Sequence, residues 1–174
     1  IWDFIDQTLL KKDAEGRDLW LYGGDFGDEP HRGSFLANGV VTADRQPHPH
    51  AFQVKQSYRP ITALPVDPVA GKLAIKNKNW FEGTGNYRLR WELTADGIVV
   101  QDGELDCPVA GPQETGEVRI PLSHPKDAAN EYHLLVHFLL KQATPWAPAG
   151  FEVAWDQFEV PFPQQTVTAV QSPQ

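Results

Sequence analysis

The 174-residue sequence contains no methionine, a single cysteine and no long apolar run. One cysteine excludes an internal disulfide but does not fix the compartment; we expect the cytoplasm and leave the periplasm and secretion open. No stretch of 18 apolar residues is present, so no membrane-spanning helix is predicted. Because the sequence begins at Ile1 and lacks methionine, we expect it to be an interior piece of a longer polypeptide.

Basic residues are also scarce. Fifteen Lys and Arg stand against 23 Asp and Glu, which gives a formal net charge of −8. Phosphate backbones demand a basic surface, so nucleic acid is not an expected partner, and solubility explains the charge. With 41% hydrophobic and 22% charged residues, the chain has the composition of an ordinary globular protein.

Residues 1–38 are rich in aromatic rings and oxygen acceptors. The rings belong to Trp2, Phe4, Trp20, Tyr22, Phe26 and Phe35, and the acceptors to Asp3, Asp6, Asp25, Asp28 and Asn38. Flat rings beside hydrogen-bonding groups suit a sugar, whose C–H faces pack on an aromatic and whose hydroxyls need polar partners. Core packing is the alternative for the rings. We expect a short strand at residues 1–5 and then an irregular loop, with an exposed turn at 13–16.

A helix is predicted between Pro47 and Pro60. Pro47 and Pro49 suit a helix entrance, and Pro60 stops the helix. Residues 1–58 then form a single βα unit, which cannot bury its own faces.

After Pro60 the apolar pattern changes to a period of two. The clearest case is residues 87–94, where apolar residues alternate with polar ones and predict one buried face formed by Tyr87, Leu89, Trp91 and Leu93. A turn at Asp96-Gly97 leads to a partner strand at 98–105. Further strands are expected at 61–64, 73–75, 118–122, 132–140 and 151–160. Seven short strands predict a mainly β protein with an immunoglobulin-like β-sandwich at residues 61–165. We centre its core on Trp80, Trp91 and Trp155, and residues 166–174 are expected to be a linker.

Three motifs in the first part of the chain resemble those of a known family. IWDFIDQ, WLYGGDFGDEP and FLANGVVTADRQPHPH resemble, in order and approximate spacing, the end of the catalytic barrel in the large microbial β-galactosidases of glycoside hydrolase family 2. WAPAGFEVAWDQFEV resembles the last strands of the β-sandwich that follows this barrel. The resemblance implies that residues 1–60 are the last strand, long loop and helix of a (β/α)8 barrel.

The same resemblance implies a function for the parent protein. It would be a retaining β-galactosidase that hydrolyses terminal β-D-galactose residues, as in lactose, through a covalent galactosyl-enzyme. The implied partners are the β-galactoside substrate and the remaining domains of the parent chain. The full-length enzyme is expected to be a homo-oligomer.

The resemblance also assigns site residues. Trp2 aligns with the aromatic floor of the galactose pocket, although it could instead merely fill the barrel mouth. Phe35, through its carbonyl, and Asn38, through its side-chain oxygen, match positions that help to hold sodium, and Asn38 could also bond a sugar hydroxyl. Magnesium is possible in the full-length enzyme. The family's catalytic glutamates lie on earlier barrel strands, so no catalytic residue is assigned here. Four carboxylates are expected to cap turns and hold the loop, namely Asp3, Asp6, Asp25 and Asp28.

Two other readings of function stay open at this point. The chain could belong to a non-catalytic carbohydrate-binding or structural β-sandwich module, because a sandwich by itself hosts many functions. The parent could also act on a β-glucuronide or β-mannoside, although the GGDFGD block favours galactose.

Several short motifs that could suggest other functions are rejected. Asp25-Phe26-Gly27 spells a kinase motif, but the rest of the kinase signature is missing. His133 and His137 lie on a predicted strand, where residues four apart are about 13 Å from each other, too far for one zinc ion. His48 and His50 are expected to cap the helix or face solvent. One departure from the family is His31-Arg32, where many relatives carry Asn-Asp.

Overall fold

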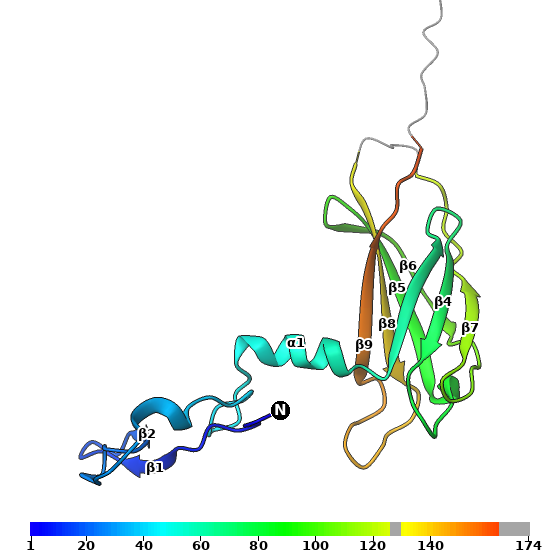
Figure 1. The fold of residues 1–174 in the computed structure, drawn as a ribbon. Helices are drawn as coiled ribbons and strands as arrows, with labels where there is room; N and C mark the ends of the chain where they lie inside the picture. The colour runs from blue at the N-terminus through cyan, green and yellow to red at the C-terminus, as the bar shows by residue number, and fades with distance from the viewer. Residues whose placement is uncertain (126–129, 164–174) are drawn as a thin grey trace, which may run out of the picture. The chain divides into compact units, whose positions relative to one another are not determined.

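The computed structural model of the protein describes residues 1–125 and 130–163. The chain forms two compact units, Ile1–Tyr58 and a second unit that begins at Arg59 (Figure 1). This division lies two residues before the predicted one, and the expected linker at 166–174 lies outside the described residues. Within the described ranges, no helix has both the length and the apolar character needed to cross a membrane.

The first unit contains an antiparallel hairpin. Strand β1 (Leu9–Lys12) pairs with β2 (Asp18–Leu21). The turn between them is held by Asp13, whose carboxylate accepts hydrogen bonds from the backbone N–H groups of Glu15 and Arg17. The exposed turn at 13–16 is therefore confirmed, whereas the irregular loop expected over the whole stretch is wrong. The apolar residues of β1 follow one another instead of alternating, so the period-two signal is missing there.

The strand expected at residues 1–5 is also wrong. The Phe4 carbonyl accepts the N–H groups of Val40 and Val41, and the Asp6 N–H donates to the Val41 carbonyl. These contacts amount to one isolated bridge. A strand needs a neighbour along its length, and the described residues supply one only at this point.

The predicted helix is confirmed. Helix α1 (Pro49–Tyr58) begins with a proline, at the position where a missing N–H costs nothing, and ends two residues before Pro60. A 3₁₀ turn, η1 (Gly33–Leu36), precedes it in the chain.

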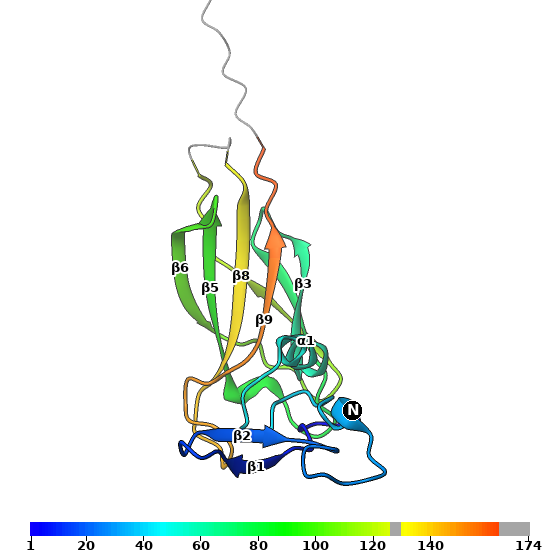
Figure 2. The same ribbon diagram turned by 90° about the vertical axis from the view of Figure 1, so that its left-hand side faces the viewer.

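The second unit is a sandwich of two antiparallel sheets. One has the order β3-β4-β7 and holds β3 (Ile61–Asp67), β4 (Lys72–Asn77) and β7 (Thr115–Arg119). The other has the order β6-β5-β8-β9 and holds β5 (Tyr87–Ala95), β6 (Ile98–Asp106), β8 (Tyr132–Leu140) and β9 (Glu152–Glu159). Figure 2 shows these four strands side by side in one layer.

The connections of the sandwich are those of an immunoglobulin-like fold. The chain passes from one sheet to the other after β4, after β6 and after β7, with the short η2 turn (Thr84–Asn86) leading into β5. The mainly β class is therefore confirmed, as are the seven sandwich strands within the described part of the chain. Strand β7 ends at Arg119, several residues earlier than the pattern predicts.

Alternating apolar residues of the central strands form the core. The predicted buried face of β5 is confirmed, because its four members are at most 7% exposed: Tyr87, Leu89, Trp91 and Leu93. Strand β8 buries every second residue in the same way. Burial of apolar surface, worth about 25 cal/mol per Å², holds the two sheets together. Cys107 belongs to this core, and burial raises its pKa to about 12, so its neutral thiol packs as a small apolar group.

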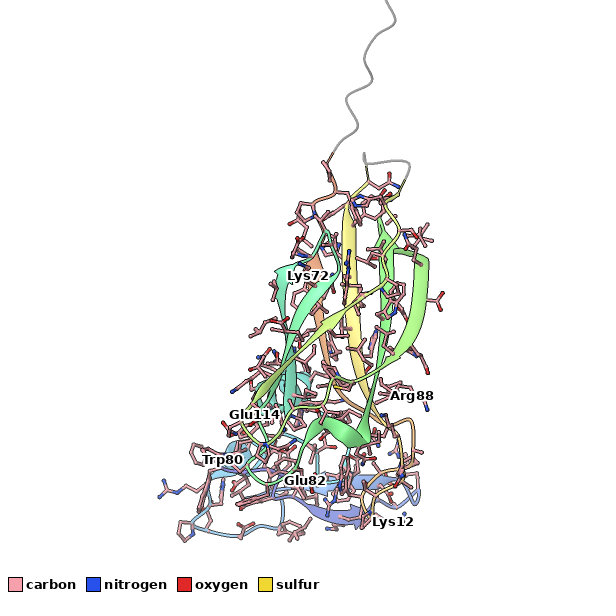
Figure 3. All side chains as sticks on the ribbon, turned by 90° about the vertical axis from the view of Figure 1, so that its right-hand side faces the viewer. Lys12, Lys72, Trp80, Glu82, Arg88 and Glu114 are labelled. Carbon is pink, nitrogen blue, oxygen red and sulfur yellow. The ribbon has the colours of Figure 1, made fainter. Side chains whose placement is uncertain are left out.

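Two of the three tryptophans expected at the core centre lie outside it. Trp91 is 4% exposed, but Trp80 is 74% and Trp155 is 39% exposed. Trp80 occupies the loop after β4, beyond the end of the sheet (Figure 3). Trp155 lies on β9 between the buried Ala154 and Asp156, so it points to the opposite face of its sheet. The expectation is wrong for both residues, because position in the sheet decides which ring is buried.

A buried carboxylate links the two sheets. Asp156 on β9 accepts hydrogen bonds from Arg59, from the Thr62 hydroxyl and from the Ala63 N–H, at 2.7–3.0 Å. It is 7% exposed, and burial raises the pKa of this carboxyl despite the hydrogen bonds and the charge of Arg59. Since Thr62 and Ala63 belong to β3, this cluster fixes β3 against β9.

Candidate substrate and cation site

Trp2 lies in the extended segment that opens the chain. Its side chain is 89% exposed, and Phe4 is also exposed, so each offers a flat apolar face to a ligand. The Gln7 N–H donates to the Leu36 carbonyl at 2.8 Å, and the Phe4 carbonyl accepts two backbone N–H groups, so this segment runs beside residues 36–41. The segments that carry Trp2 and Asn38 are therefore neighbours.

Phe35 and Asn38 present two oxygen atoms near each other in the chain. Phe35 lies in the η1 turn, where its N–H donates to the Arg32 carbonyl, and both Phe35 and Asn38 are exposed. Among the described residues, neither the Phe35 carbonyl nor the Asn38 side-chain oxygen accepts a hydrogen bond. A carbonyl and an amide oxygen are ligands that hard cations prefer, but two are fewer than such an ion takes. These residues fit part of a cation site.

Asp6 joins the start of the chain to the segment after Asn38. Its Oδ1 accepts the Gly39 N–H at 2.6 Å, and its Oδ2 lies 2.9 Å from the Nε2 of His48. Burial opposes ionisation of Asp6, but the hydrogen bonds with His48 and Gly39 outweigh it and lower its pKa. The Nε2 of His50 lies 3.0 Å from the Gly39 carbonyl. His50 is exposed, as expected, although its ring also bonds the Gly39 carbonyl. For His48 the expectation is wrong, because its part-buried ring contacts Asp6 instead of facing solvent or capping the helix.

Gly39 is fixed by a close approach of two backbones. A Cβ at this position would lie 2.3 Å from the Asp6 nitrogen and 2.5 Å from the Ile5 carbonyl carbon. Glycine is thus required where the two segments meet.

The glycine-rich loop is closed by its own carboxylates. Asp25 accepts the N–H of Tyr22, and Asp28 accepts the N–H of Gly24, both at 2.9 Å. The hydrogen bond from Gly24 is the main reason why the pKa of Asp28 is lowered. Asp6, Asp25 and Asp28 thus hold the loop as the sequence predicts, whereas Asp3 makes no such bond among the described residues. Asp13, outside that prediction, holds the β1–β2 turn. That no catalytic acid or base lies in this chain stays a prediction.

His31, the departure from the family pattern, has a place in this loop. A Cβ on Gly24 would lie 2.7 Å from the His31 ring, and one on Gly23 would lie 3.1 Å from the His31 Cβ. The His31 Nδ1 also accepts the Gly33 N–H at 3.1 Å. The His31 imidazole therefore packs against Gly23 and Gly24, a contact that no sequence signal indicates.

The structure gives no zinc site at His133 and His137. Both lie on β8, and the Nδ1 of His137 contacts Glu152 at 2.7 Å. In the described part of the chain, no group of three or more His, Cys, Asp or Glu side chains could hold a metal ion.

Comparisons with known families fix the class of protein. Residues 1–63 match the family described as "Glycosyl hydrolases family 2, TIM barrel domain", and residues 73–161 match "Beta-galactosidase, domain 4". The two matches fall on the first unit and on the sandwich. The fold and the matches together define a segment of a glycoside hydrolase.

Curated relatives narrow this class. "Beta-galactosidase 2" of Enterobacter cloacae is 36% identical over 163 residues, which is 94% of this chain and 16% of that protein. The β-galactosidase of Halalkalibacterium halodurans is 43% identical over 160 residues, or 90% of this chain and 15% of that protein. The β-galactosidase of Priestia megaterium is 37% identical over 163 residues, which is 92% of this chain and 16% of that protein. The chain belongs to the β-galactosidases of glycoside hydrolase family 2. It spans about one sixth of the length of these relatives.

Proposed function

We propose that this chain works as part of a longer retaining β-galactosidase and supplies substrate and sodium contacts, but not the catalytic glutamates. The observation that carries this proposal is the match over both units to relatives named β-galactosidase. The match of residues 1–63 to a catalytic barrel favours an enzyme over a non-catalytic module. The relatives' names favour galactose over glucuronic acid or mannose.

Trp2 would form the floor of the galactose subsite. Its exposed indole face can pack against the C–H face of the sugar and hold the ring in place for attack. The contribution is one of orientation, because an indole neither donates nor accepts the proton that the reaction moves.

Phe35 and Asn38 would hold a sodium ion beside the sugar. Their two oxygens accept no hydrogen bond from the described residues, which leaves both available to a cation. When bound, sodium would supply a positive charge that a sugar hydroxyl can contact. The remaining ligands, and any magnesium ligands, would come from other parts of the full-length enzyme.

The reaction would be a double displacement. A carboxylate attacks the anomeric carbon while an acid protonates the leaving oxygen, and water then hydrolyses the galactosyl-enzyme. In this scheme the described chain binds and orients substrate, and the sandwich is a spacer between the barrel and the next domain. The full-length enzyme would be a homo-oligomer.

A sodium titration of the full-length enzyme tests the proposed cation ligand. Asn38→Ala should raise the sodium concentration needed for half-maximal hydrolysis of a chromogenic β-galactoside by about tenfold, because one oxygen ligand is lost. Gln53→Ala, which removes an exposed amide on α1, is the matched control and should leave the titration unchanged. An unchanged titration in Asn38→Ala would exclude this side chain from the sodium site.

A further inference from the structure

The peptide group that follows Asn38 is held from both sides. Its N–H, that of Gly39, donates to Asp6 at 2.6 Å, and the Gly39 carbonyl lies 3.0 Å from the Nε2 of His50. Since a carbonyl oxygen only accepts hydrogen bonds, the His50 Nε2 must be the donor. Gly39 is thereby fixed at both of its backbone polar groups.

The acceptor Asp6 is itself held. It is 9% exposed, and the His48 Nε2 donates to its second oxygen at 2.9 Å. The rings of His48 and His50 stack, with centroids 5.5 Å apart and planes 9° from parallel. A network of three side chains thus runs from the entrance of α1 to the two segments of the candidate site. We call it the Asp6 clamp, formed by Asp6, His48 and His50.

The Asp6 clamp leaves the two segments little freedom. The close approach of Gly39 to the Asp6 nitrogen admits no side chain, and the Val40 and Val41 N–H groups both donate to the Phe4 carbonyl. The His48 N–H also donates to the Val40 carbonyl at 3.1 Å. A shift of either segment would break several of these bonds together.

The site oxygens depend on this arrangement. The side chain of Asn38 is exposed and has no hydrogen bond within the described part of the chain, so the contacts that place it act through its backbone. The Asp6 clamp fixes the backbone at Gly39, the residue after Asn38. The Phe35 carbonyl lies three residues before Asn38 in the same segment. Ligands of a cation bind best when their supporting contacts orient them beforehand.

We propose that Asp6, His48 and His50 are positioning residues that aim Asn38 and the Phe35 carbonyl at the sodium and galactose subsite. This assignment rests on the proposed function. It extends the site from residues that touch ligands to the contacts that orient them.

The test uses the full-length enzyme with His48→Ala, His50→Ala and the conservative changes His48→Gln and His50→Gln. His133→Ala, on the sandwich strand β8, is the matched control. Three quantities are measured: the sodium concentration for half-maximal hydrolysis of a chromogenic β-galactoside, the KM and kcat at low and saturating sodium, and amide hydrogen exchange of residues 35–41 without sodium.

For both alanine variants we expect faster exchange at Gly39 and an approximately tenfold higher half-saturating sodium concentration. KM should rise at low sodium and return towards the wild-type value at saturating sodium, with kcat changed less. Glutamine, which keeps an N–H donor, should restore most of the sodium affinity. Since His50 is exposed, His50→Ala remains testable even if His48→Ala fails to fold.

Two results would overturn the proposal and are distinguishable. Faster exchange with unchanged sodium dependence and KM would show that the clamp is only structural, while the proposed function stands. A wild-type enzyme without β-galactosidase activity would overturn the proposed function, and the positioning role would fall with it.

Discussion

At the scale of single residues, the buried carboxylate of Asp156 carries the sharpest consequence for stability. Asp156→Ala removes the shared acceptor of Arg59, Thr62 and the Ala63 N–H and leaves buried donors without it. The free energy of unfolding of the sandwich should fall by about 3–5 kcal/mol, as when one partner of a buried pair is deleted. Urea unfolding followed by circular dichroism measures this.

The matched control for Asp156 is an exposed pair. Arg88 and Glu104 lie 3.0 Å apart with side chains about half exposed, so Glu104→Ala should cost at most about 1 kcal/mol. If both substitutions cost the same, the link between β3 and β9 does not contribute as described.

The site residues show what the sequence could and could not reveal. The motifs assign roles to Trp2, Phe35 and Asn38. The structure shows where these residues lie but does not test the roles. The loop-holding role of Asp25 and Asp28 was predictable, because each bonds a backbone N–H three or four residues away. The contact between Asp6 and His48 joins residues 42 positions apart, and no local pattern encodes such a pairing.

At the level of strands, β6 has a glycine at the position where the Trp91 indole of β5 packs against it. Gly103 pairs directly with Trp91 of β5, and a Cβ on Gly103 would lie 3.0 Å from the indole. Gly103→Val should displace the buried Trp91 and lower the free energy of unfolding by about 1–3 kcal/mol. Near-ultraviolet circular dichroism and urea unfolding measure the two effects.

Gly85 provides the control for this substitution. Outside the neighbouring residues of its own turn, no atom lies within 4 Å of a Cβ built there, so Gly85→Val should change stability by about 0.5 kcal/mol or less. Equal effects at Gly85 and Gly103 would contradict packing of Trp91 over Gly103.

The sequence predicts some helices and strands better than others. Central strands β5 and β8 have one buried face each, so their alternation is strong and their bounds were found closely. Helix α1 was marked by prolines at both ends. The hairpin β1-β2 was missed because every residue of β1 is exposed, so no face selects a period of two.

At the scale of the whole molecule, the two units differ in how much they bury. In Ile1–Tyr58 the only buried hydrophobic residue is Val40, whereas the sandwich has an extensive apolar core. Limited proteolysis of the 174-residue chain should therefore cut residues 1–58 first and leave a fragment that begins near Arg59. Mass spectrometry of the time course identifies the cuts, and equal resistance of both units would contradict this prediction.

The proposed function places this chain in a β-galactosidase whose catalytic glutamates lie outside it. Its most direct test compares hydrolysis of a chromogenic β-galactoside by the full-length protein and by the 174-residue chain, with and without sodium. We expect activity in the full-length protein only, increased by sodium. Activity in neither would contradict the assignment to an enzyme, and activity in the isolated chain would mean that its own carboxylates perform the reaction.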